Sequence, residues 1–269
     1  MRRLVWLAAP ILVAFAVAVP PVLAQAPAAA AVELAGHRAL YTLTLASSRG
    51  DVTSAGGTMA FEMTDACEGW ATRQRMRINV TNRDGQNIEI GSDYATFESK
   101  DGLNLRYTMR QTTDQAVTSE TEGTATLPAI GAAGEARYTR PAEAIKKLPA
   151  GTMLPNMHTI AIIEAARAGK KFLAIPLFDG TTADGAQDTS VAVFSWDKPQ
   201  QNKFEALRNL PSGRVRIAFF DRDKGATTPD YELGMRYYEN GIAEEMSMDF
   251  GDFVMRATLQ ELAVLPKGC

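Results

Sequence analysis

The stretch RQRMRINV, residues 73–80, separates its side chains into two alternating sets. Gln74, Met76, Ile78 and Val80 form one set, and Arg73, Arg75, Arg77 and Asn79 form the other. Successive side chains of a β-strand point to opposite faces, so this period of two predicts a strand with one apolar face and one strongly cationic face. The same period recurs in YTLTL (41–45), VRIAF (215–219) and MRATLQ (255–260). The chain is therefore expected to be mostly β, with half-buried antiparallel strands.

Tight turns are predicted between the alternating runs. The dipeptides Asp84-Gly85, Asp101-Gly102, Asp179-Gly180 and Asn240-Gly241 each lie between two such runs. Asp-Gly and Asn-Gly readily adopt the positive φ angles that a tight hairpin needs. Counting runs between turn signals gives about 12 to 14 strands, and that many short strands in one chain predict a large curled sheet, barrel or spiral.

One segment has the spacing of a helix. Between Pro155 and Ala168 the apolar residues Met157, Ile160, Ala161, Ile163 and Ala168 recur at helical intervals. Proline suits the first helical turn and Gly169 suits the C-terminal stop, so we expect one helix of about 14 residues, packed on or inside the sheet. Residues 140–151, just before it, are expected to be an irregular connection.

The N-terminus has the layout of a cleavable secretory signal. Two arginines (2–3) precede an apolar run (4–19), and two prolines and small residues follow (20–24). The run is about 16 residues long, short of the ~20 that a membrane anchor needs, and prolines interrupt it. We expect cleavage after Ala24, release into the periplasm without a membrane anchor, a disordered lead-in over 25–32 and a single domain over 33–269.

The charge balance argues against several partners. The chain has 28 Lys and Arg against 31 Asp and Glu, and removal of Arg2 and Arg3 with the leader leaves 26 against 31, a net charge of −5. A mildly acidic chain without a basic stripe is not expected to bind nucleic acid or to hold anionic lipid headgroups. It has no exposed heptad or apolar stripe, which predicts a monomer.

The two cysteines, Cys67 and Cys269, are most simply interpreted as a disulfide in an oxidising compartment. Two independent free thiols are the alternative. The bridge would tie the C-terminus to a strand end near the start of the domain. Without a CxxC motif, a thiol oxidoreductase is not indicated.

Several stretches, taken in order, resemble one known family. They are His37-Arg38-Ala39 leading into Tyr41 and Leu43, Cys67-Glu68-Gly69-Trp70, Gly151-Thr152-Met153 with Pro155 before His158, Tyr238-Glu239-Asn240-Gly241, Asp249-Phe250-Gly251-Asp252-Phe253, and Cys269. The ordered set resembles the envelope integrity protein B (EipB) family of α-proteobacterial periplasmic proteins over about residues 33–269.

This resemblance implies a β-spiral, or broken barrel, of about 14 strands with one long α-helix, and a disulfide between Cys67 and Cys269. It also implies a role in maintaining the cell envelope without a known catalytic activity. The motif positions to which it assigns no role are His37, Trp70, His158, Asn240, Gly241, Asp249, Gly251 and Asp252.

Catalytic chemistry finds little support in the residues. Only His37 and His158 could act as bases near neutral pH, and no G-x-S-x-G nucleophile motif is present. His37, at a strand entry, is expected on the surface or in a capping role. The acid pairs Asp249/Asp252 and Glu244/Glu245 lack the groove with aromatic platforms that a glycosidase needs, and are expected to be solvated. We therefore predict no catalytic residue.

Metal and cofactor sites are not predicted either. Two histidines and a disulfide-bonded cysteine pair cannot form the usual zinc site. The Asp221-x-Asp223-x-Gly225 stretch begins like a calcium loop but lacks the later carboxylate ligand, so a hairpin turn is expected. Met246 and Met248 could offer thioethers to Cu(I), but core packing is the better interpretation.

Three functional hypotheses follow. The first is a non-enzymatic periplasmic protein that supports the envelope by binding an envelope protein, lipid or peptidoglycan. The second is a carrier of lipid or lipoprotein in a concave apolar cavity. Methionines such as Met59, Met76 and Met235 would suit such a cavity, but they would suit a large core equally. The third is a hydrolase of envelope polymers.

Overall fold

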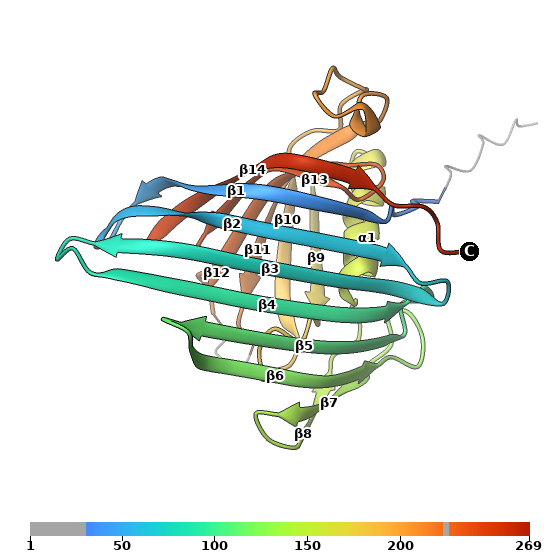
Figure 1. Ribbon diagram of the computed structural model, residues 1–269. Helices are drawn as coiled ribbons and strands as arrows, with labels where there is room; N and C mark the ends of the chain where they lie inside the picture. The colour runs from blue at the N-terminus through green and yellow to red at the C-terminus, as the bar shows by residue number, and fades with distance from the viewer. Residues whose placement is uncertain (1–30, 223–225) are drawn as a thin grey trace, which may run out of the picture. The chain divides into compact units, whose positions relative to one another are not determined.

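The computed structural model describes residues 31–222 and 226–269 (Figure 1). The expected signal peptide, its cleavage after Ala24 and most of the lead-in lie outside the described residues. Val32, at the end of the expected lead-in, is buried and belongs to the folded unit Val32–Cys269. Among the described helices, none combines the length and the apolar character that crossing a bilayer requires.

All described strands form one antiparallel sheet. Its strands are β1 (His37–Ser48), β2 (Val52–Asp65), β3 (Gly69–Asn82), β4 (Asn87–Ser99), β5 (Asn104–Thr113), β6 (Ala116–Thr126), β7 (Gly134–Arg140), β8 (Ala144–Leu148), β9 (Phe172–Leu177), β10 (Gln187–Val193), β11 (Ser212–Phe220), β12 (Tyr231–Tyr238), β13 (Ala243–Asp249) and β14 (Phe253–Val264). Their order is β8-β7-β6-β5-β4-β3-β2-β1-β14-β13-β12-β11-β10-β9. The prediction of a mostly β chain with about 14 strands is confirmed.

The alternation in the sequence becomes an inner and an outer face. Tyr41 and Leu43 of β1 are buried, whereas Thr42 and Thr44, which alternate with them, are exposed. Register partners share a face, and Tyr41 lies opposite Met59 of β2 and next to Leu259 of β14. Burying each such apolar side chain contributes about 1.5–3 kcal/mol, which drives the sheet to curl around its apolar side.

The inside of the curl is filled by the helix α1 (Pro155–Arg167). Ile162 of α1 belongs to the same buried cluster as Ile78 of β3 and Ile217 of β11, from opposite halves of the sheet. In Figure 1 the helix stands behind strands β1 to β4. The predicted helix is confirmed, with Pro155 in its first turn and its end at Arg167 rather than Ala168.

The two ends of the sheet, β8 and β9, do not pair with each other, so the sheet is an open spiral. One residue spans part of the gap: Met153 N donates to Pro176 O (2.9 Å), and Phe178 N donates to Met153 O (3.0 Å). The predicted irregular connection over 140–151 was wrong, because residues 144–148 form β8. This five-residue strand has adjacent lysines instead of an alternating pattern, so its sequence carried no strand signal.

The turn predictions were confirmed at three of four positions. Gly85, Gly102 and Gly241 have positive φ angles and lie in the short connections after β3, β4 and β12. Gly180 also has positive φ, but it lies in the longer segment 178–186 between β9 and β10, which packs against the inner face. The turn after β5 is made by Asp114 and Gln115, two non-glycine residues at positive φ that no turn signal marked.

Candidate functional site

His37 is buried, so the expected surface position was wrong, and its side chain bonds to the backbone at the strand entry. Its side chain is 3% exposed, and Nδ1 donates to the carbonyl of Ala35 (2.8 Å). The imidazole lies against Phe61, with ring centroids 5.0 Å apart. Burial lowers the pKa of His37. An uncharged histidine with one backbone partner and one aromatic neighbour is a packing residue.

His158 is buried inside the spiral, on α1. Its Nε2 lies 2.9 Å from Thr189 Oγ1, and that hydroxyl donates its proton to Ile175 O (2.6 Å). Since a hydroxyl has one proton to donate, His158 donates through Nε2–H. Burial lowers its pKa to about 4, so the ring is neutral at pH 7. His158 therefore connects the helix to β9 and β10, and no contact brings it together with His37 among the described residues.

Trp70 lies at the start of β3, beside the β2–β3 connection that the disulfide joins to the C-terminus. Cys67 and Cys269 are bonded, with Cα atoms 5.5 Å apart, as the sequence predicted. Lys100 Nζ pairs with Asp65 (2.7 Å) and lies 4.9 Å from the centre of the Trp70 ring. A disulfide, an ion pair and a cation–π contact therefore come together at this point.

The remaining motif positions hold strand connections in place. Asp249 pairs with Arg49 and accepts a hydrogen bond from Gly251 N (3.0 Å), and the Asp252 carbonyl accepts one from Arg49 N (2.7 Å). These bonds join the β1–β2 and β13–β14 turns. Asn240 and Gly241 form the β12–β13 turn, where the Asn240 carbonyl accepts from Ala35 N (2.9 Å).

The other carboxylate pair is also divided between separate partners. Glu244 accepts hydrogen bonds from Tyr238 Oη (2.8 Å) and Asn202 Nδ2 (2.9 Å), whereas Glu245 pairs with Arg214 (2.5 Å). The two acids therefore do not face one reacting group.

No metal site is formed by the part of the chain that the structure describes, where no three His, Cys, Asp or Glu side chains come together. The expected turn at Asp223 and Gly225 lies outside the described residues. Met246 and Met248 are buried in the core, packed in the same cluster as Met255.

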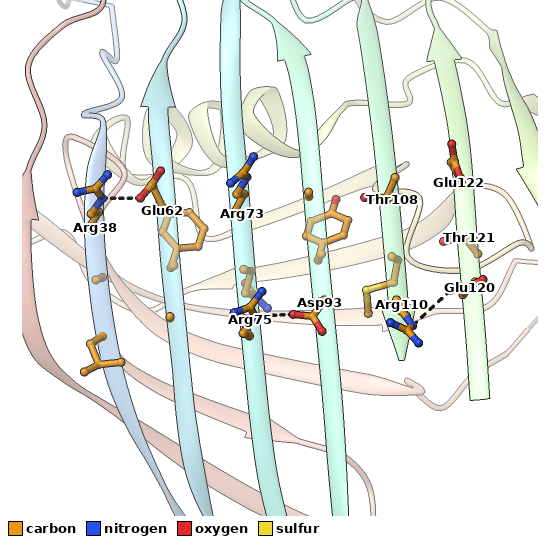
Figure 2. Close-up of a pocket in the computed structure, with 18 of the residues that line it drawn as sticks. Arg38, Glu62, Arg73, Arg75, Asp93, Thr108, Arg110, Glu120, Thr121 and Glu122 are labelled. Atoms are coloured by element: carbon orange, nitrogen blue, oxygen red, sulfur yellow. Dashed lines mark hydrogen bonds and ion pairs between the residues drawn. The ribbon is translucent and has the colours of Figure 1, made fainter. Parts of the chain in front are cut away.

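A hollow lies on the outer face of strands β1–β6 and extends to the neighbouring strands β14 and β7. Its volume is about 980 Å³. We call it the arginine groove. Its charged lining residues are Arg38, Arg73, Arg75, Arg110, Arg140, Glu62, Asp93, Glu120, Glu122 and Glu261. Figure 2 looks onto this face, where the labelled charged side chains stand on the viewer's side of neighbouring strands.

The strand register arranges these charges in rows. Arg38, Glu62 and Arg73 are partners across β1, β2 and β3, and Arg75 and Asp93 are partners across β3 and β4. Small side chains interrupt the rows at Ala60, Ala95 and Thr108, which all line the groove. A hollow results because these short side chains lie between long ones.

Most of the groove's arginines are already paired. Arg75 pairs with Asp93 (2.7 Å), Arg140 with Glu120 (2.6 Å), and Arg110 with Glu120 (3.4 Å). Exposed pairs of this kind contribute about 0–1 kcal/mol each, so they orient side chains more than they stabilise the fold. Arg38 also pairs with Glu62.

Arg73 differs from its neighbours because its side chain forms no ion pair or hydrogen bond with any described residue, and the carboxylate of Glu261 across the groove is likewise unpaired within the described ranges. These two groups keep their full capacity to bind a ligand. The alternating arginines of residues 73–77 predicted a cationic strand face, which is a partial signal of this site.

Sequence reasoning missed one buried acid, Glu98 of β4. Its carboxylate accepts hydrogen bonds from the first-turn amides of α1, Asn156 N (2.7 Å) and Met157 N (3.1 Å). Burial raises its pKa to about 7, although these hydrogen bonds act in the opposite direction. No local pattern could reveal this group, because the cap comes from a strand distant in the sequence.

Comparison with known proteins agrees with the motif resemblance. A family model described as EipB-like matches residues 28–266. The chain is 31% identical over 251 residues to the cell envelope integrity protein EipB of Brucella abortus (strain 2308), covering 90% of this chain and 89% of that protein. The crystal structure of a β-barrel-like protein with a domain of unknown function, also from Brucella abortus, matches with a TM-score of 0.78 and 30% identity, over 87% of this chain and 99% of the other. The family expected from the motifs is confirmed: the chain belongs to the EipB-like family.

Proposed function

We propose that this chain is a non-enzymatic periplasmic protein that supports the integrity of the cell envelope by binding an envelope component in the arginine groove. The observation that carries the role is membership of a family whose relative is named a cell envelope integrity protein. The exported location rests on the signal-like N-terminus, and the non-enzymatic character rests on the buried, structurally engaged histidines.

The chemistry of the groove favours a ligand with charges of both signs. Its lining holds five arginines and five carboxylates. A polyanion would meet as many like charges as opposite ones, whereas a polypeptide with acidic and basic side chains could satisfy both. Arg73 and Glu261 are the groups that such a ligand would engage first. We therefore favour a peptide-like component, in an envelope protein or in peptidoglycan, as the partner.

The geometry argues against the carrier hypothesis. A carrier needs an apolar cavity that can be vacated, but the inside of the spiral is filled by α1 and by side chains such as Ile162 and Phe178, which are fully buried. Met59, Met235 and Met255 lie in the core rather than on a concave surface. Admitting an acyl chain would require displacing packed side chains.

The first experiment tests the groove by charge reversal. In a strain that lacks the protein, Arg73→Glu is expected to abolish rescue of growth on detergent, because it reverses the groove's unpaired cation without breaking an ion pair among the described residues. Arg256→Glu is the matched control: Arg256 is an exposed arginine of β14 that lies outside the groove and has no ion partner among the described residues.

Equal melting temperatures of the two variants would show that both are folded. Equal rescue by Arg73→Glu and Arg256→Glu would contradict the groove as the binding surface. Release of soluble fragments from purified peptidoglycan by the wild-type protein would contradict the non-enzymatic character. Native mass spectrometry of protein purified gently from its host would test the carrier hypothesis, which requires a bound mass that is lost on organic extraction.

A further inference from the structure

The edge strand β9 has one open side. Val193 N donates to Lys171 O (2.9 Å), and the β9–β10 register pairs Phe172 with Ala192 and Ala174 with Ser190. In an antiparallel pair the hydrogen-bonded residues alternate, so residues 171, 173 and 175 bond to β10. The N–H and C=O groups of Phe172 and Ala174 therefore point to the open side. Met153 confirms this assignment of the two sides of β9, because its N–H donates to Pro176 O on the side away from β10.

An apolar surface adjoins this open edge. Phe172 is 76% exposed and Phe194 is 63% exposed, the highest values among the large hydrophobic side chains that the structure describes. Phe172 lies opposite Ala192, and Phe194 is two residues beyond Ala192, so both rings are on the same face of the sheet. Exposed rings next to free backbone groups are what an added strand would cover.

The charges around the edge restrict the partner further. Arg167, Lys170 and Lys171 lie within five positions at the entry to β9, and none of them has an ion partner in the described part of the chain. A partner strand with acidic residues at this end would complement them. A second copy of the chain fits less well, since its other open edge, β8, carries Lys146 and Lys147.

We propose that the open side of β9 binds an extended segment of a partner protein by strand addition. The segment's backbone pairs with Phe172 and Ala174, its apolar side chains cover Phe172 and Phe194, and its acidic end lies beside residues 167–171. A lipid surface would leave the free backbone groups without partners, which favours a peptide strand. This edge is separate from the arginine groove, so the proposal stands independently of the proposed function.

The test uses the full folded chain and a synthetic peptide of alternating valine and threonine with two glutamates at one end. The same peptide with a central proline is its control. We expect the first peptide to bind and to slow hydrogen exchange at the Phe172 and Ala174 amides. Ala174→Pro removes the donor on the open side without removing a bond to β10, and is expected to weaken binding about tenfold. Ala174→Val keeps the donor and should bind like wild type.

Loss of the apolar surface gives a second measurement. Phe172→Ser with Phe194→Ser should weaken peptide binding, whereas Ile130→Ser, which changes an exposed side chain elsewhere, should not. Unchanged affinity of Ala174→Pro, or no binding of the alternating peptide, would overturn the proposal. So would tight binding to phosphatidylglycerol vesicles that depends on the two phenylalanines but not on Ala174, or self-association that Ala174→Pro abolishes.

Discussion

Gly180 shows how much a single backbone position depends on its surroundings. Its φ is +73°, and a Cβ atom there would lie 2.3 Å from the ring of Tyr107 on β5. Gly180→Ala is therefore expected to lower the free energy of unfolding by about 3 kcal/mol, because positive φ and overpacking both oppose the methyl group. Urea unfolding measures the change.

Gly85 supplies the matched control for this substitution. Its φ is +78°, but nothing lies within 4 Å of an added Cβ. Gly85→Ala should cost only the backbone strain, about 1 kcal/mol. If the two substitutions lowered stability equally, the packing of segment 178–186 against Tyr107 would not contribute as the structure implies.

The two glycines also show what residue patterns can and cannot predict. Asp-Gly predicted positive φ at both positions, and both have it. At Gly180 the pattern also predicted a tight hairpin, which was wrong. The reason is that Phe178, two residues before it, packs with Tyr107 and Tyr138 in the core, and Thr121 Oγ1 donates to Gly180 O (2.5 Å). Such distant partners leave no trace in a dipeptide.

At the scale of one element, helix α1 was predictable but its fastening was not. Its apolar spacing, Pro155 and Gly169 gave its position within one residue. The residue at its N-cap, Leu154, makes no capping bond, so the usual signal of a helix start was missing. Glu98 from β4 provides the cap instead, and Thr189 from β10 holds His158.

The two titratable groups at α1 should affect stability in opposite directions. Glu98 has a folded pKa of about 7 against a usual 4.5, so the native state binds more protons and stability falls as pH rises from 4.5 to 7. His158 has a folded pKa of about 4 against a usual 6.5, so stability is lost as pH falls from 6.5 to 4. Each effect is on the order of 3 kcal/mol, and between pH 4.5 and 6.5 they nearly cancel.

Substituting one group at a time should expose the other. Glu98→Gln is expected to lose stability relative to wild type as pH falls from 7 to 4, since of the two groups at α1 only His158 then titrates. His158→Gln is expected to lose stability as pH rises from 4.5 to 7. Thermal unfolding across pH 4–8 measures both, with the double variant as control. Parallel pH profiles of wild type and both single variants would contradict this assignment.

At the scale of the whole molecule, the strand number and the spiral were predictable and the strand order came only with the structure. Alternation marks most of the strands but not their neighbours, so nothing local indicated that β1 pairs with β14. The same limit applies to the interior. Methionine content fitted a cavity and a core equally, and the burial of Met59, Met248 and Met255 decides for the core. The arginine groove depends on register between eight strands, β14 and β1–β7, which periodicity alone cannot supply.

The disulfide is the one covalent link across this arrangement. It joins Cys67, after β2, to Cys269, beyond the end of β14, with a sequence separation of 202. In the loop-closure model, a link across so long a segment stabilises the fold by about 5 kcal/mol. Structure that persists in the unfolded chain lowers this contribution. The β1–β14 pairing and the bond from Leu265 N to Gly36 O (2.8 Å) do not depend on it, so the fold should persist without it.

Cys269→Ser is therefore expected to lower the urea midpoint while leaving the circular dichroism spectrum of the native protein unchanged. The serine keeps the size of the side chain, and the substitution leaves Cys67 at its positive φ undisturbed. A phosphine reductant should lower the midpoint of the wild type to that of the variant and have no effect on the variant itself. Since the reductant acts only through the bridge, a wild-type midpoint that stays the same after reduction would mean that the sheet and the filled interior alone hold the two ends of the chain together.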